Sequence, residues 1–127
     1  MASEFAKLDQ LEDERADQFV YFVRVTFSNA AVRAKFVEWL RGGHLAEVVR
    51  AGALDAELVE LELATDAPPG ALRPIEARYH FASHAAFETY ANGPAVALRA
   101  QGAALFPPTS GVVMTRGQAR SLLRIPR

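Results

Sequence analysis

His44 is the residue of this chain best suited to moving a proton near neutral pH. It follows Gly42-Gly43 and precedes an apolar run, so it stands at the start of an expected short helix that ends before Gly52. The positive end of a helix disfavours imidazolium. We therefore expect a neutral, partly buried ring with a pKa below the usual value of about 6.5, able to act as a base or a donor. The alternative is a histidine that only caps or packs a helix junction.

Aromatic residues could form a pocket around this histidine. Tyr21 and Tyr79 fall on the apolar side of expected strands, where a buried phenol needs either a hydrogen-bond partner or a cavity. If the chain binds a ligand, we expect His44 to act as base or donor and Tyr79 to supply a hydroxyl group. The aromatic residues expected to line the pocket are Trp39, Tyr21, Phe36 and Phe87. Trp39 could equally be a core residue.

Metal, nucleotide and paired-acid sites have less support. His44, His80 and His84 do not share a metal-ligand spacing, and no glycine loop of the nucleotide-binding type is present. Glu60 and Glu62 would lie about 6.5–7 Å apart on one strand face, which suits paired-acid catalysis, but ion pairing explains them as well. We expect no metal and no cofactor, and a role for haem or oxygen stays open.

The order of hydrophobic patterns predicts how these residues are positioned. Alternating runs indicate strands at 19–27, 58–63, 75–81 and 111–116. A helix capped by Ser28 and Asn29 carries an apolar stripe through Trp39 and should end at Gly42-Gly43. A second helical region at 84–105 follows Ser83 and is interrupted near Pro94. This order is the βαββαβ, or split βαβ, arrangement of an α+β fold.

The two faces of the predicted sheet differ in character. The apolar face, which helices must cover, carries Tyr21, Val23, Val25, Val59, Leu61, Leu63, Ile75, Ala77, Tyr79 and Phe81. The opposite face mixes charges with apolar groups: Arg24, Glu60, Glu62, Glu76, Arg78 and His80, with Val20, Phe22 and Leu58. Such a face fits a sheet-on-sheet interface, so we expect a homodimer.

Composition narrows the class of protein. The 127 residues are 50% hydrophobic and 23% charged with a net charge of −1, which gives no electrostatic case for nucleic acid or an anionic membrane. There is no cysteine, no apolar run near the roughly 20 residues of a membrane span and no signal-peptide pattern. We expect a cytoplasmic protein with a domain at 18–127. An acidic extension at 1–17, with a helix at 3–15, should precede it.

Two stretches of sequence support a resemblance to a known superfamily. They are Trp39-Leu40-Arg41-Gly42-Gly43-His44, followed by Ala51-Gly52, and Tyr79-His80-Phe81, which leads to Phe87 and Tyr90. With the pattern from about residue 19 to 116, they resemble an uncharacterised bacterial family in the dimeric α+β barrel superfamily. The resemblance implies a ferredoxin-like fold, with a four-stranded antiparallel sheet, helices on one face, and ligands bound between the two.

That superfamily includes cofactor-free quinone-forming monooxygenases, polyketide cyclases, haem peroxidases, muconolactone isomerases and stress proteins, so fold alone does not decide function. One hypothesis is that the protein binds or transforms a small apolar or aromatic molecule without a cofactor, in the manner of a monooxygenase or cyclase. The alternative is a non-catalytic dimeric assembly or regulatory module with a filled core. An apolar cavity that His44 or a tyrosine hydroxyl enters would favour the first.

Overall fold

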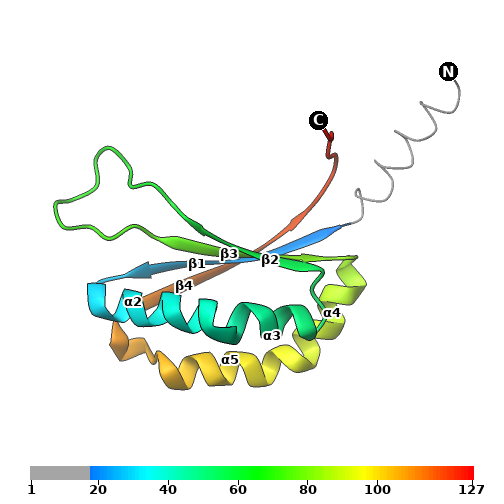
Figure 1. Ribbon diagram of the computed structural model, residues 1–127, viewed down its shortest axis with the longest axis horizontal. Coiled ribbons are helices and arrows are strands. Elements are labelled where there is room, and N and C mark those ends of the chain that lie inside the picture. The colour runs from blue at the N-terminus through cyan, green and yellow to red at the C-terminus, as the bar shows by residue number, and fades with distance from the viewer. Residues whose placement is uncertain (1–17) are drawn as a thin grey trace, which may run out of the picture.

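A four-stranded antiparallel sheet forms one layer of the molecule, and helices form a second layer on one of its faces (Figure 1). The computed structural model describes residues 18–127, so the helix expected at 3–15 and the extension at 1–17 lie outside it. In spatial order the strands are β2 (Asp55–Glu60), β3 (Ile75–Phe81), β1 (Phe19–Phe27) and β4 (Val112–Arg120). The predicted ferredoxin-like α+β fold is confirmed.

The helical layer contains two units. The first joins α2 (Ala30–Trp39), the turn η1 (Leu40–His44) and α3 (Leu45–Arg50); the second joins α4 (His84–Asn92) and α5 (Pro94–Leu105). A short η2 (Pro108–Ser110) precedes β4. The side chain of Asn29 accepts a hydrogen bond from Val32 N at 3.0 Å, and Ser83 caps α4 by accepting from Ala86 N. No helix within residues 18–127 is long and apolar enough to cross a membrane.

Alternating apolar residues place the core between the two layers. β1 and β3 pair with Tyr21 opposite Tyr79 and Val23 opposite Ala77, and paired residues share a face of the sheet. Phe81, Val25 and Val48 are the largest side chains that are almost completely buried. The predicted helix-facing side of β1 and β3 is confirmed.

β2 differs from its prediction in both position and orientation. It spans Asp55–Glu60 rather than 58–63, and Leu58 pairs with Ala77 on the helix-facing side. Val59 therefore lies on the opposite face beside Glu76, the reverse of the prediction. The alternation continues through Leu61 and Leu63 although the strand ends at Glu60, so pattern alone misplaced the strand.

β4 extends to Arg120, beyond the predicted end at residue 116, because it pairs with the full length of β1. Gly117 lies opposite Phe22, and the Phe22 ring occupies the space that a Cβ at Gly117 would need. The absence of a side chain at Gly117 thus leaves room for an aromatic ring from the neighbouring strand.

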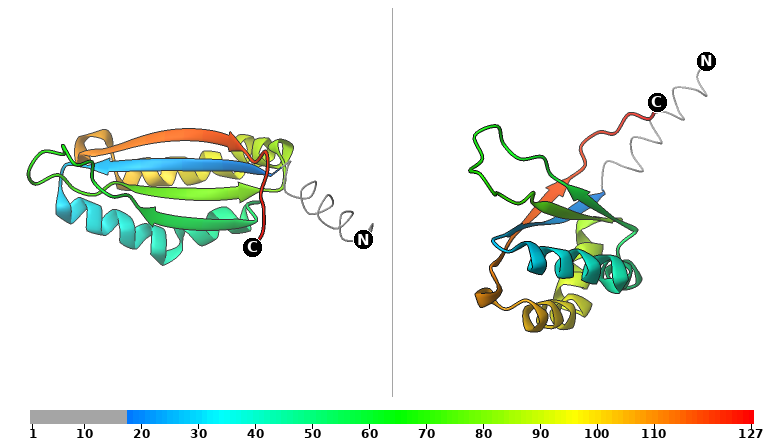
Figure 2. Two further views of the ribbon diagram at one scale, coloured as in Figure 1. Left: turned by 90° about the horizontal axis from the view of Figure 1, so that it is seen from above. Right: turned by 60° about the vertical axis from the view of Figure 1, so that its left-hand side comes forward.

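The face of the sheet opposite the helices, here called the open face, carries a compact charge cluster. Glu76 is only 4% exposed and accepts hydrogen bonds from Arg24 Nε at 2.9 Å and Arg78 Nε at 2.8 Å. Burial raises the pKa of Glu76, but the two guanidinium groups outweigh burial and hold it below the usual carboxyl range. The loop 61–74 and the C-terminal segment 121–127 extend on this side of the sheet (Figures 1 and 2).

Candidate functional site

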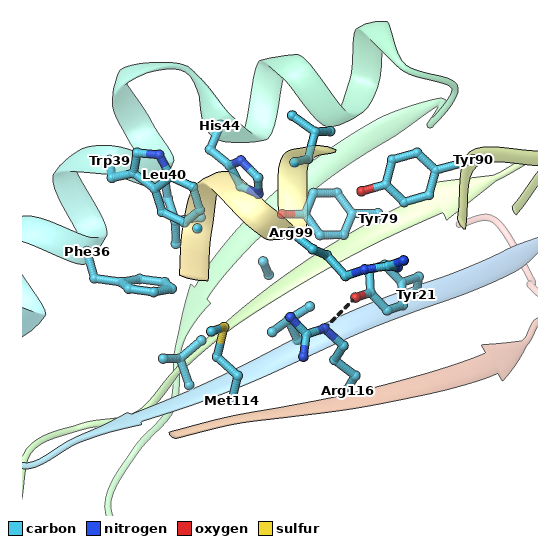
Figure 3. A pocket seen from close by; sticks show the side chains of 15 residues that line it. Tyr21, Phe36, Trp39, Leu40, His44, Tyr79, Tyr90, Arg99, Met114 and Arg116 are labelled. Atoms are coloured by element: carbon cyan, nitrogen blue, oxygen red, sulfur yellow. Dashed lines mark hydrogen bonds between the residues drawn. The ribbon is translucent and has the colours of Figure 1, made fainter. Parts of the chain in front are cut away.

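A small cavity lies between the sheet and the helices, here called the sheet–helix cavity (Figure 3). The volume of this cavity is about 60 Å³. Its lining residues come from β1, α2, η1, β3, α4, α5 and β4: Tyr21, Val23, Val25, Phe36, Trp39, Leu40, His44, Ala77, Tyr79, Tyr90, Leu98, Arg99, Gly102, Met114 and Arg116. The wall is mainly apolar and aromatic, and none of these residues is acidic.

An unusual helical turn positions His44 in this wall. The Leu45 amide donates to the Leu40 carbonyl, a bond spanning five residues, so η1 is a π-helical turn that contains one more residue than an α-helical turn. This wide turn lets the rings of Trp39 and His44, also five residues apart, stack with centroids 4.0 Å apart and planes 22° apart. The break predicted at Gly42-Gly43 is found at Gly43, whose backbone angles are non-helical, and α3 follows at once after this kink.

The environment of His44 favours a neutral ring. Its Nδ1 atom is buried and has no hydrogen-bond partner among the described residues. Burial lowers the pKa of His44, while the charge of Glu47 partly opposes the shift. The expected direction of the shift agrees with the structure, but the expected cause does not. His44 is the residue before α3, as predicted, but its side chain makes no capping hydrogen bond, and burial is the main cause of the lowered pKa.

Three tyrosines, Tyr21, Tyr79 and Tyr90, line the cavity. Tyr21 stacks on Tyr79 with ring centroids 5.9 Å apart. Burial raises the pKa of Tyr79 well above its ordinary value, with smaller contributions from Tyr90 and Tyr21. Burial, and then Tyr21, raises the pKa of Tyr90 to about 12, against the opposing charges of Arg99 and Arg116. At neutral pH the hydroxyls of Tyr79 and Tyr90 therefore keep their protons and can donate hydrogen bonds.

Two arginines at the mouth of the cavity were not predicted as site residues. Arg116 Nε donates to the Tyr21 hydroxyl at 3.1 Å, and Arg99 Nη2 donates to the Ala91 carbonyl at 3.3 Å. Both side chains belong to exposed residues, and Figure 3 shows their guanidinium groups close to Tyr21. Arg116 lies beside Val23 in the register, on the helix-facing side of β4. Arg116 belongs to a C-terminal region rich in arginine, which is visible in the sequence. The sequence does not show that α5 and β4 come together at the cavity.

The structure brings together most of the predicted site residues. His44, Tyr79, Trp39, Tyr21 and Phe36 all line the sheet–helix cavity. The exception, Phe87, lies in the neighbouring core, with its ring 5.0 Å from that of Phe19 and 5.3 Å from that of Phe81. Tyr90, one helical turn after Phe87, takes the cavity position instead.

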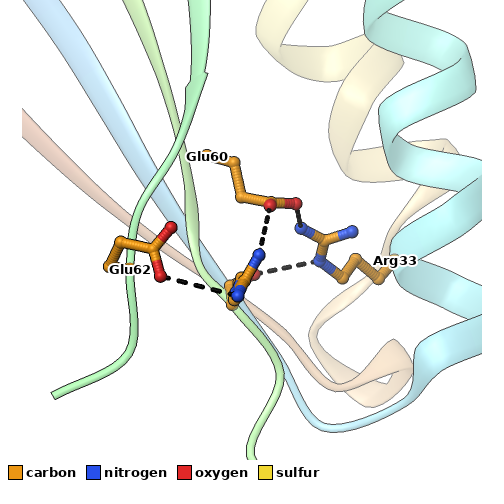
Figure 4. Close-up of polar contacts among 4 residues, drawn as sticks. Arg33, Glu60 and Glu62 are labelled. Atoms are coloured by element: carbon orange, nitrogen blue, oxygen red, sulfur yellow. Dashed lines mark hydrogen bonds and ion pairs between the residues drawn. The ribbon is translucent and has the colours of Figure 1, made fainter. Parts of the chain in front are cut away.

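The acidic pair Glu60 and Glu62 has a structural role away from this cavity (Figure 4). Glu60 accepts from Arg33 of α2 at 2.6 Å and from Arg73 at 3.2 Å, while Glu62 lies 3.5 Å from Arg73. Hydrogen bonds from Arg33 and Arg73 lower the pKa of Glu60. Since these contacts join α2 to β2 and to the segment before β3 within one chain, paired-acid catalysis is not needed to explain the two glutamates.

Comparisons with known proteins identify the architecture. The sequence matches no protein-family model and no curated protein. A dimeric ferredoxin-like protein from an uncultured marine organism superposes with a TM-score of 0.65 at 14% identity, covering 86% of this chain and 99% of that one. A variant of SnoaB, a cofactor-independent oxygenase from Streptomyces nogalater, gives a TM-score of 0.62 at 20% identity, covering 88% and 100%.

A monooxygenase from Streptomyces coelicolor, solved with the ligand Nanaomycin D, gives a TM-score of 0.55 at 19% identity, covering 91% of this chain and 97% of that one. These similarities establish a shared fold. At the level of the fold, they agree with the expected ferredoxin-like α+β architecture.

Proposed function

We propose that this protein is a homodimer in which each subunit binds a small, planar, largely apolar aromatic molecule in the sheet–helix cavity and transforms it without a cofactor. One observation carries the proposal: beside an aromatic cavity, a buried imidazole nitrogen of His44 has no hydrogen-bond partner within residues 18–127. Among the lining residues His44 is the only side chain able to accept a proton at neutral pH, since the others that titrate are tyrosines and arginines.

The chemistry follows from these groups. His44 takes the proton of a phenolic hydroxyl, and the Tyr79 hydroxyl donates a hydrogen bond to the oxyanion that forms. Stacking on Trp39 fixes the plane of the imidazole. An electron-rich phenolate of this kind reacts with dioxygen directly. For 1-naphthol, one molecule of dioxygen gives 1,4-naphthoquinone and one molecule of water.

The similar structures support this choice within a diverse superfamily. One is described as a cofactor-independent oxygenase, and another is a monooxygenase that binds Nanaomycin D. The similarity in fold extends over 88% and 91% of this chain, respectively.

The dimer is argued from the open face. On that face Arg24 and Arg78 pair with the nearly buried Glu76, and an isolated subunit leaves both arginines and the partly exposed apolar Phe22 in contact with water. The similar structure from an uncultured marine organism is that of a dimeric ferredoxin-like protein. Because the cavity and its arginines lie on the helix side, pairing through the open face leaves the cavity mouth accessible.

Native mass spectrometry of freshly purified protein tests binding and assembly together. We expect a dimer mass with up to one small molecule per subunit. An oxygen electrode with 1-naphthol then tests the reaction: the wild type should consume oxygen and form the quinone, while His44→Phe, which keeps an aromatic ring beside Trp39, should not. His84→Gln, at an exposed position of α4, serves as the matched histidine control.

The volume of the cavity favours a second candidate function. About 60 Å³ is far below the roughly 300–1,000 Å³ of typical ligand pockets, so a ligand must displace side chains to enter. A non-catalytic dimeric module with a nearly filled core would have this property. A dimer that retains no molecule, binds no aromatic probe and consumes no oxygen would establish the module instead.

A further inference from the structure

The sheet–helix cavity has two chemically different ends. At the inner end, Trp39 stacks on His44, whose Nδ1 is buried without a partner. At the mouth lie Arg99 and Arg116, and Figure 3 shows them on the Tyr21 side of the cavity, away from Trp39. A ligand that spans the cavity therefore meets a neutral base at one end and two cations at the other.

The two arginines act on the same small region. Both guanidinium charges act on the Tyr90 hydroxyl, which also lines the cavity. Within residues 18–127 neither guanidinium makes an ion pair, whereas Arg24, Arg33, Arg73 and Arg78 each do. No aspartate or glutamate lines the cavity to neutralise them.

Each arginine already uses part of its donor capacity on neutral groups of the protein. Arg116 donates through Nε to Tyr21, and Arg99 donates through one Nη2 to the Ala91 carbonyl. A guanidinium has five donors, so both retain N–H groups while these bonds limit where the planar groups can lie. Positioned cations with unused donors suit a carboxylate, which accepts paired hydrogen bonds from arginine.

From this arrangement, and resting on the proposed ligand-binding function, we propose that the natural ligand is an aromatic carboxylate. Its ionised acid group binds Arg99 and Arg116 at the mouth, and its ring enters the cavity toward Trp39 and His44. The arginine pair thus selects for acid-bearing ligands over neutral aromatics of the same shape.

A matched pair of probes tests this selection. 4-Hydroxyphenylacetate carries a phenol at one end and a carboxylate at the other, and 4-hydroxyphenylacetamide has the same shape without the charge. Trp39 is the only tryptophan of the chain, so its indole N–H gives a single NMR signal from the cavity wall. We expect the acid to shift that signal at a concentration at least about tenfold lower than the amide, as for a charge-assisted hydrogen bond.

Arginine variants assign the effect. Arg99→Gln and Arg116→Gln should each weaken binding of the acid about tenfold and leave binding of the amide unchanged. Arg50→Gln, at the end of α3 and outside the cavity lining, should change neither. Amide spectra of each variant verify that the fold is kept.

The outcomes separate the two proposals. Equal affinity for acid and amide, or loss of both in the arginine variants, would overturn the selection for acids while leaving aromatic binding intact. Failure of both probes to move the Trp39 signal in the wild type would contradict aromatic binding and the acid preference together.

Discussion

Replacing His44 with phenylalanine should make the protein more stable while removing its candidate base. In the wild type, His44 Nδ1 is buried and finds no hydrogen-bond partner in the part of the chain that the structure describes. An unsatisfied buried polar group costs about 1–3 kcal/mol, and since the residue as a whole is only partly buried we expect a gain of about 1–2 kcal/mol on its removal. Phenylalanine keeps an aromatic ring against Trp39, and the adjacent cavity can take its extra volume.

The gain should depend on pH. Burial holds the folded-state pKa of His44 below its ordinary value, so the unfolded chain takes up the proton first as pH falls. The stability associated with the neutral ring is complete above about pH 6.5 and is lost below it, toward the folded-state pKa. His44→Phe has no such loss at this position. Its advantage over wild type should therefore be larger near pH 5.5 than near pH 8.

Urea unfolding at both pH values, followed by circular dichroism, measures the effect. The midpoint should rise at an unchanged slope, which marks a change of stability and not of the unfolded state. His84→Gln, at an exposed position of α4, should not raise the urea midpoint. An unchanged or lower midpoint for His44→Phe near pH 8 would refute the reasoning, because it would mean that the imidazole is already satisfied in the native protein.

Three further predictions concern the open face and the helices. Arg78→Glu places a like charge beside Glu76 and should shift the dimer toward monomer in analytical ultracentrifugation; a stable dimer would contradict the open-face interface. Glu76→Gln should lower the free energy of unfolding by about 1–2 kcal/mol near pH 7. Between pH 5 and pH 3 this variant should lose less stability than the wild type, because the lowered pKa of Glu76 gives the wild type stability that disappears as pH falls below the ordinary carboxyl pKa. Gly102→Val should lower the stability measured in thermal unfolding by about 1–3 kcal/mol, because a Cβ atom at this position would lie 3.1 Å from the Trp39 ring. Gly42→Ala, whose Cβ would meet no atom within 4 Å, should be neutral or stabilising.

Strong local patterns made much of the fold predictable. The strand at 19–27 and the strand at 75–81 have the predicted bounds, because alternation, chain direction and composition agree there. Asn29, Ser83 and Pro94 mark helix starts through local chemistry that needs no tertiary context.

The bounds of β2 depend on its pairing with β3, which local sequence patterns do not reveal. The charged start of β2 does not look like a strand, but Asp55 and Glu57 lie opposite His80 and Arg78 in the register of β3. Paired charges of this kind favour strand pairing that intrinsic propensity alone would not predict.

The candidate site was predictable only where its residues share one helix or one strand face. His44 and Trp39 are near neighbours in the chain, and Tyr21 and Tyr79 follow from strand alternation. Arg99 and Arg116 come from separate elements that meet only in the folded protein. Their shared location depends on how α5 packs beside β4, and no spacing in the sequence encodes that directly.

The π-helical turn at η1 makes the length of one short segment a determinant of binding. Gly43 inside this turn has non-helical backbone angles (φ 160°, ψ −26°), so the direction of α3 relative to α2 depends on this short segment. Deleting a single residue between Leu40 and His44 would change the five-residue separation at which the rings of Trp39 and His44 stack, and we expect it to remove that stacking. A one-residue insertion or deletion is therefore the shortest evolutionary step between a chain of this fold with a base in its cavity and one without.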